Sequence, residues 1–293
     1  MSISLSNSLL ELEIQEAGQK YKGSRFDWTG QITQIKYKEM HSFCTNETLK
    51  PEKLNELGRG LYNEFGIDDP IGYNECALGD KYPKIGIGML TRDSDKPYVF
   101  YKPHEVLPAN FNHDSTKDSV SFISDCKEIN GYGFKLLKKI TLKDDTFSIK
   151  YKLFNTGTKE ISTSEYVHNF LSINNRKIDN SYQLKFSAPL KQNGEIVNPE
   201  EKVKFSDNRI NWVSEVGKEF FFSEILPFKE GITSWQLENL NDKVGIKESC
   251  SFNPLRVNLW GSTHVVSPEI FFKLKVAPGK SISWQRNYIV YEF

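Results

Sequence analysis

A histidine stands in the middle of a β-strand pattern in the segment SEYVHNFLSIN, residues 164–174. Alternate side chains of a regular strand share a face, so His168 lies with Tyr166 and Phe170. Aromatic rings can pack on the C–H faces of a sugar while an imidazole orients a polar atom, so this face suits a small, hydroxyl-rich ligand. A histidine satisfied within an aromatic core fits the same pattern. The strand alone leaves both interpretations open.

Other stretches carry polar side chains that could join such a site. Glu269 stands at the start of an alternating strand, at the edge of a sheet, where loops commonly build sites. Arg25, in YKGSRFDWTGQI, offers several fixed donors for a sugar hydroxyl or an anionic group, although a strand with an internal ion pair to Asp27 is the simpler interpretation. Trp260 and His264 come just before Glu269 and could line the same pocket.

Period-2 alternation dominates the chain that positions these residues. Apolar and polar side chains alternate over residues 10–15, 147–153 and 270–276, which predicts strands. The turn APGKS and the segment ISWQRNYIVYEF follow the third of these, and together they predict a C-terminal hairpin.

Only one stretch has a clear helical period, and it predicts one short surface helix between Pro51 and Gly66, with an apolar stripe formed by Leu54, Leu57, Leu61 and Phe65. No repeat, linker or composition shift divides the 293 residues. A chain of this length needs two packed sheets to bury its apolar faces. The sequence therefore predicts an all-β fold, a single large antiparallel β-sandwich over residues 1–293 with one or two short helices.

The charge balance narrows the classes of partner. Lys+Arg and Asp+Glu are equal at 38 each, which argues against a nucleic-acid partner and against attachment to an anionic membrane. No segment approaches the ~20 apolar residues of a membrane span, and the N-terminus lacks the basic region of a signal peptide. The four cysteines form no CxxC or zinc-type cluster, so we expect reduced thiols, a cytoplasmic protein and no metal site.

Three of these segments together resemble the galactose mutarotase-like (aldose 1-epimerase) superfamily. In that family a strand of the form N-H-x-Y-F-N-L carries the catalytic histidine, and VHNFLSI places His168 there, with Val167 in place of the asparagine. The catalytic glutamate of the family lies shortly before a last hairpin with a P-G turn, and Glu269 in SPEIFFKLKVAPGKSISW matches it. GSRFDWTGQI is similar to the early strand of a divergent branch, in which an arginine, here Arg25, lies near the sugar pocket.

The resemblance implies a supersandwich fold and the interconversion of α and β anomers of a small carbohydrate, with His168 as acid and Glu269 as base. Opening the sugar ring requires one acid and one base, each of which typically contributes ~10²–10⁴-fold, and no metal, cofactor or covalent intermediate. The two side chains should then converge on one pocket, about a sugar ring apart. The second active-site histidine of the family, in N-x-L-H-G-G, has no match; His104 and Lys102 lie in the corresponding part of the chain.

That missing motif leaves a second function open, namely a carbohydrate-binding protein of the same fold without turnover. A sugar lyase or hydrolase is a third class, because related folds occur in such enzymes. The sequence does not identify the sugar, its phosphorylation or acidity, or the oligomeric state.

Overall fold

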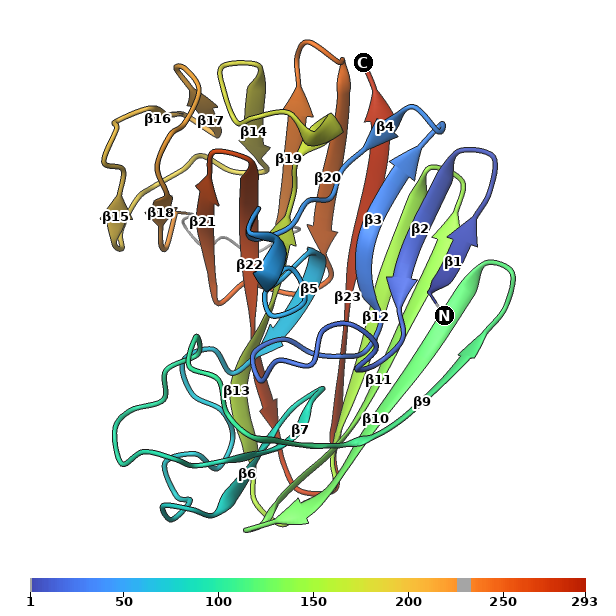
Figure 1. Cartoon of the computed structure of the whole chain (residues 1–293), viewed down its shortest axis with the longest axis vertical. Helices are drawn as coiled ribbons and strands as arrows, with labels where there is room; N and C mark the ends of the chain where they lie inside the picture. The colour runs from blue at the N-terminus through green and yellow to red at the C-terminus, as the bar shows by residue number, and fades with distance from the viewer. Residues whose placement is uncertain (1, 226–232) are drawn as a thin grey trace.

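The computed structural model describes residues 2–225 and 233–293, and it is almost entirely β (Figure 1). Within these residues, two antiparallel sheets of ten strands each pack face to face, and a small sheet of three strands lies beside them. This architecture confirms the predicted all-β sandwich. No helix in the described part of the chain is long and apolar enough to cross a bilayer.

The first sheet carries the segments that contain His168 and Glu269. Its neighbouring strands, in spatial order, are β1 (Ile3–Ser6), β2 (Leu10–Gln15), β3 (Gln31–Tyr37), β5 (Gly60–Phe65), β13 (Ile161–Phe170), β22 (Val265–Val276), β21 (Arg256–Ser262), β18 (Phe220–Phe222) and β15 (Ile196–Val197), with β4 (His41–Ser42) paired to β3.

The second sheet covers one face of the first. Its spatial order is β16 (Val203–Ser206), β17 (Arg209–Trp212), β14 (Tyr182–Phe186), β19 (Ser234–Asn239), β20 (Val244–Cys250), β23 (Ser281–Glu292), β12 (Thr146–Asn155), β11 (Tyr132–Lys143), β10 (Ser119–Ile129) and β9 (Asn110–Ser115). The small sheet and two 3₁₀ turns complete the elements: β6 (Lys81–Lys84), β7 (Gly88–Thr91), β8 (Val106–Pro108), Pro51–Lys53 and Ile173–Asn175.

The main core lies between the two large sheets and follows the alternation of the sequence. On β12, Phe147, Ile149, Tyr151 and Leu153 are buried, while Ser148, Lys150 and Lys152 point outward. β2 likewise buries Leu10, Leu12 and Ile14. The strands predicted from alternation are thus confirmed, because each buries one face against the opposite sheet.

The predicted C-terminal hairpin is wrong. β22 pairs with β13 and β21 in the first sheet, whereas β23 pairs with β12 and β20 in the second. The turn at residues 277–280 therefore carries the chain from one sheet across to the other. Both strands have one apolar face, and these faces meet across the sandwich instead of lying side by side in one sheet.

The predicted helix between Pro51 and Gly66 is also wrong. Only the 3₁₀ turn Pro51–Lys53 forms there, and residues 60–65 are strand β5, which is buried along its whole length. A strand that is covered on both faces has no alternation of apolar and polar residues. The spacing of Leu61 and Phe65 therefore matched that of a helix by chance.

A second layer covers the other face of the first sheet. Loop residues 16–30 and the small sheet supply side chains such as Phe26, Trp28 and Tyr82, which pack on Tyr62 of β5 and Phe170 of β13. In Figure 1 this loop passes the lower end of β5, and the small sheet lies below β5, near β13. The outer face of the first sheet is thus buried beneath loops over much of its middle.

Asp27 anchors that covering loop. Residues 21–30 form no strand, and the expected Arg25–Asp27 ion pair is absent. The buried Asp27 carboxylate instead accepts hydrogen bonds from the backbone N–H and hydroxyl of Thr29 and from Nζ of Lys138, which rises from β11 of the second sheet. The loop is therefore pinned through the first sheet to the second one.

A buried ionic cluster also joins the two sheets. Arg286 of β23 donates to Glu248 of β20 at 2.6 Å and to Glu165 of β13 at 2.8 Å, and all three side chains have no exposed surface. Its guanidinium also donates to the carbonyl of Ile270. Charges removed from water are tolerated only when they are paired in this way.

Candidate functional site

The register of the first sheet places His168 opposite Glu269. β13 and β22 pair Glu165 with Phe272, and a bridge pairs Leu171 with Val266. Continued between these two points, the same register sets His168 directly across from Glu269. Both side chains lie on the face that loop 16–30 covers.

Ser267, two residues before Glu269 on the same face of β22, lies beside both groups. Its hydroxyl oxygen lies 2.8 Å from Nδ1 of His168 and 3.3 Å from Oε1 of Glu269, and Nε2 of His168 lies 3.2 Å from that same Oε1. A hydroxyl has one proton, so when Ser267 donates to Glu269 it accepts from Nδ1 of His168.

Burial decides which of the two groups is protonated. His168 and Glu269 are each 4% exposed. Desolvation raises the pKa of Glu269 to about 8, although the positive charge of Arg25 opposes the rise. Desolvation, with Arg25 adding to it, lowers the pKa of His168 well below its ordinary value. Near neutral pH the carboxyl therefore holds the proton and the imidazole is neutral.

Aromatic rings enclose the imidazole. Phe170 stacks on His168 with ring centroids 3.9 Å apart, and Trp260 meets it edge-on at 5.2 Å. Phe26 from the covering loop and Tyr166 lie at 6.1 Å and 5.9 Å. These rings exclude water, which is the cause of both pKa shifts.

Arg25 covers the His168–Glu269 pair, and several contacts hold its side chain in place. Its guanidinium donates to Glu64 at 2.9 Å, to Tyr166 at 3.2 Å and to Glu47 at 3.3 Å. It also lies between the rings of Phe26 and Phe100, at 4.4 Å and 4.5 Å from their centroids. The stacked and hydrogen-bonded guanidinium therefore has one defined orientation.

A cavity of about 660 Å³ opens above Arg25 and Phe26, and it is large enough for a sugar. Its walls include Tyr21, Phe100 and Lys102. His168 and Glu269 do not line it, because Arg25 and Phe26 separate them from it. The cavity and the His168–Glu269 pair therefore lie on opposite sides of Arg25 and Phe26.

Only some of the candidate site residues predicted from the sequence lie close together in the structure. His168, Glu269, Arg25 and Trp260 come together, and Lys102 lines the cavity while its Nζ lies 3.0 Å from Asp93, whereas His104 and His264 lie elsewhere.

His104 is packed against Tyr98, with ring centroids 5.7 Å apart and planes 13° from parallel, and its Nδ1 lies 3.5 Å from a carboxylate oxygen of Asp93. Nε2 of His264 is hydrogen-bonded to the carbonyl of Asn46 at 3.0 Å. Neither histidine lines the cavity or contacts the pair.

The distance between His168 and Glu269 differs from the expected one. The two groups touch at 3.2 Å instead of standing a sugar ring apart. Their protonation is also the reverse of the expected assignment, because the carboxyl, not the imidazole, holds the proton.

Two side chains of the candidate site escaped the sequence analysis, Ser267 and Glu64. Ser267 shares a face of β22 with Glu269, so strand periodicity could have found it. Glu64 was hidden because its segment was assigned to a helix. The described residues contain no cluster of three or more metal-ligating side chains.

No protein-family model matches the chain, and a comparison with curated proteins found no match either. Solved structures do match over its full length. A galactose mutarotase related enzyme from Lactobacillus acidophilus is 12% identical with a TM-score of 0.63, covering 100% of this chain and 98% of that one. A galactose mutarotase-like protein from Clostridium acetobutylicum is 14% identical with a TM-score of 0.61, covering 100% and 95%.

A third structure extends the likeness. An aldose epimerase homologue from C. elegans is 10% identical with a TM-score of 0.54, covering 100% of this chain and 99% of that one. At such identities the likeness concerns the fold. Two ten-stranded sheets with matched coverage from end to end give the chain the galactose mutarotase-like fold.

Proposed function

We propose that the protein interconverts the α and β anomers of a small sugar by acid–base ring opening, as an aldose 1-epimerase does. One observation carries this proposal: Nε2 of His168 and Oε1 of Glu269 lie 3.2 Å apart beneath a sugar-sized cavity. Groups with strongly perturbed pKa values in such a place are typical of catalytic sites. The descriptions of the structural neighbours, among them an aldose epimerase homologue, point to the same chemistry.

The chemistry needs an acid and a base that act on two oxygens of the same carbon. Glu269 gives its proton to the ring oxygen, and Nε2 of His168 takes the proton of the C1 hydroxyl. The bond between C1 and the ring oxygen breaks, and the C1 carbonyl forms. Rotation about the C1–C2 bond and the reverse transfers then yield the other anomer and restore both groups.

Direct contact between the two catalytic groups suits this reaction. The ring oxygen and the C1 hydroxyl are both bonded to C1, so an acid and a base that touch each other can serve both at once. The raised pKa of Glu269 favours the acid role and the lowered pKa of His168 favours the base role. Ser267, when it accepts from Nδ1, holds the imidazole in the tautomer that leaves Nε2 free to accept.

A sugar must pass Arg25 and Phe26 to reach the pair. In this proposal the Phe26 ring swings away from His168, and the sugar takes its place against Phe170 and Trp260. Arg25 then faces the sugar hydroxyls, and Lys102 lies at the mouth of the cavity.

The decay of optical rotation of freshly dissolved α-glucose and α-galactose tests the proposal. We expect acceleration by the wild-type protein and a loss of ~10²–10⁴-fold in His168→Asn and in Glu269→Gln. His113→Asn and Glu195→Gln, which change exposed residues far from the pair, should retain full activity. Equal activity in all five proteins would contradict the assignment of the pair.

One observation favours a second function, a carbohydrate-binding protein without turnover. Neither His168 nor Glu269 lines the cavity, so a sugar could bind above Arg25 and never meet them. In that case sugars would raise the melting temperature of the protein while the optical rotation decayed at the rate in buffer. Fast decay would exclude this alternative.

A further inference from the structure

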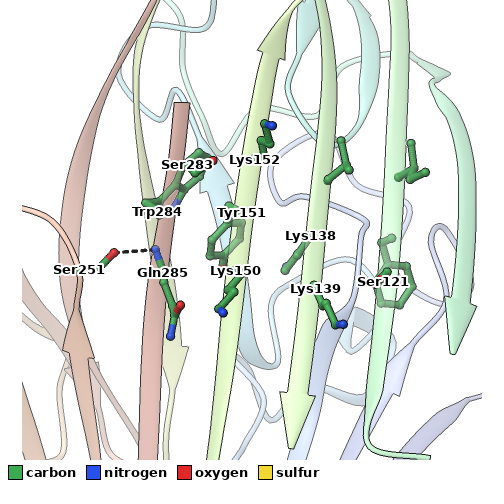
Figure 2. Close-up of a pocket in the computed structure, with 13 residues that line it drawn as sticks. Ser121, Lys138, Lys139, Lys150, Tyr151, Lys152, Ser251, Ser283, Trp284 and Gln285 are labelled. Atoms are coloured by element: carbon green, nitrogen blue, oxygen red, sulfur yellow. Dashed lines mark hydrogen bonds between the residues drawn. The ribbon is translucent and has the colours of Figure 1, made fainter. Parts of the chain in front are cut away.

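A second concave surface lies on the outer face of the second sheet, away from His168. It forms a cavity of about 590 Å³ over β10, β11, β12 and β23. Figure 2 shows Lys139, Lys150 and Lys152 on neighbouring strands, between Ser121 on one side and Ser283 and Gln285 on the other. We call this surface the lysine groove. The main core separates it from the region of the His168–Glu269 pair.

The charge of the lysine groove is unbalanced in a chain that is neutral overall. Neither β11 nor β12 contains an aspartate or a glutamate, and their outward side chains include five lysines: Lys135, Lys139, Lys143, Lys150 and Lys152. The register sets Lys139 directly opposite Lys150. Like charges in that position destabilise a sheet, so a fold selected only for stability would avoid the pair.

Some lysines elsewhere on the surface are paired with carboxylates. Lys38, Lys159 and Lys177 lie 2.5–2.6 Å from carboxylate oxygens. Within the described residues, none of the three groove lysines forms a salt bridge; Lys152 instead lies over the ring of Phe154 at 4.7 Å. Three ammonium groups are therefore left without a counter-charge in one concave place.

The spacing of these ammonium groups matches an extended anionic ligand. Residues opposite each other on neighbouring strands stand roughly 5 Å apart at Cβ, and residues two apart on one strand roughly 7 Å. Lys139 and Lys150 can thus hold one anionic group together, while Lys152 reaches the next. Ser121, Ser283 and Gln285 add hydroxyl and amide groups beside them.

The remaining lining distinguishes between classes of polyanion. The aromatic residues of the groove, Phe122, Tyr151 and Trp284, are buried with their rings in the core, so no ring is available to stack a nucleobase. Hydroxyl and amide partners together with ammonium groups suit a sugar chain that carries carboxylates or sulfates.

We propose that the lysine groove is a binding site for an acidic oligosaccharide. Each acidic group is held by the ammonium groups of Lys139, Lys150 and Lys152, and the sugar hydroxyls are held by the neighbouring serines and glutamine. This site is separate from the proposed anomerase site, and it stands or falls independently of the activity there.

Calorimetric titration of the full chain tests this site. The probes are an oligogalacturonate hexamer, which carries carboxylates, and a heparin-derived hexasaccharide, which carries sulfates; maltohexaose is the neutral comparison. We expect an acidic hexasaccharide to bind more weakly as salt increases and maltohexaose not to bind. Failure of both acidic probes to bind, or equal binding of maltohexaose, would overturn the proposal.

Matched variants assign the binding to the groove. The triple variant Lys139→Gln, Lys150→Gln, Lys152→Gln should lose at least tenfold in affinity. The control variant Lys191→Gln, Lys204→Gln, Lys218→Gln removes the same charge from exposed lysines outside the groove and should stay within twofold of wild type. The single variant Lys150→Glu should also bind more weakly, should the triple variant fail to fold. Equal losses in the groove and control variants would reject the site.

Two further probes test the class of ligand. A twelve-residue oligothymidylate and vesicles rich in phosphatidylserine should bind more weakly than the acidic hexasaccharide at the same salt concentration. Tighter binding of either, lost in the groove variant, would make the groove a nucleic-acid or membrane site and overturn the proposal.

Discussion

Glu269 and His168 both lie in a place where water is excluded, and the exclusion acts on them in opposite directions. A carboxyl is neutral when protonated and an imidazole is neutral when deprotonated, so burial alone moves the proton toward Glu269. The sequence could suggest that these two residues belong together, because both fall in short recognisable motifs. It could not reveal which one holds the proton, since that depends on burial beneath side chains such as Phe26, which comes from a distant segment.

The raised pKa of Glu269 predicts how stability depends on pH. An unfolded glutamate loses its proton near pH 4.3, whereas the folded one holds it up to about pH 8. The folded state thus binds more protons in that window, and its free energy of unfolding falls as pH rises through it. Since one pKa unit corresponds to about 1.4 kcal/mol, the loss has an upper limit of about 5 kcal/mol.

Glu269→Gln, which mimics the protonated carboxyl, should remove that loss. Its stability advantage over wild type should grow from pH 5 to pH 8 and stay level above, as measured by urea unfolding at each pH. Glu195→Gln, an exposed change, should show no such trend. A pH-independent difference between Glu269→Gln and wild type would mean that Glu269 ionises normally in the folded protein.

At the scale of elements, alternation predicted the strands that cover a core on one side only, such as β2 and β12. It failed for β5, which is buried on both faces and therefore has no period of two. The pairing of the last two strands could not be predicted either, because a short turn joins β22 to β23 as in a hairpin. They lie in different sheets because each sheet needs a central strand: β22 joins β13 to β21, and β23 joins β12 to β20. The helix assigned to β5 also concealed Glu64, the partner of Arg25.

The pairing of β11 with β12 makes a prediction about the lysine groove. Lys139 and Lys150 repel each other across the two strands, so Lys150→Glu should replace a repulsion by an attraction. We expect a gain of about 0.2–1 kcal/mol in the free energy of unfolding, measured with urea at low salt and shrinking at high salt. Lys204→Glu is the control at an exposed position outside the groove. Unchanged or lower stability in Lys150→Glu would show that the two ammonium groups do not sense each other.

At the scale of the whole molecule, Arg286 joins the two sheets through fully buried ion pairs with Glu165 and Glu248. Arg286→Met would leave Glu165 and Glu248 buried without their cation, and we expect a loss of about 3–5 kcal/mol in the free energy of unfolding. Adding Glu165→Gln and Glu248→Gln to Arg286→Met should restore most of the loss, because no buried charge then lacks a partner. Guanidinium unfolding measures both variants.

The control is Arg209→Met, an exposed position that should change stability by less than about 0.5 kcal/mol. If the triple variant were no more stable than Arg286→Met alone, the loss would come from packing and not from the unpaired carboxylates.

The crossing of the chain from β22 to β23 also bears on how the protein is made. β22 lies between β13 and β21, and β23 lies between β12 and β20, so without residues 265–293 each sheet falls into two unconnected halves. During translation neither sheet can close until this segment has left the ribosome, and both then close together. Until that moment the nascent chain exposes four open strand edges, which are templates for aggregation. We therefore expect its dependence on chaperones to be concentrated in the last moments of synthesis of this segment.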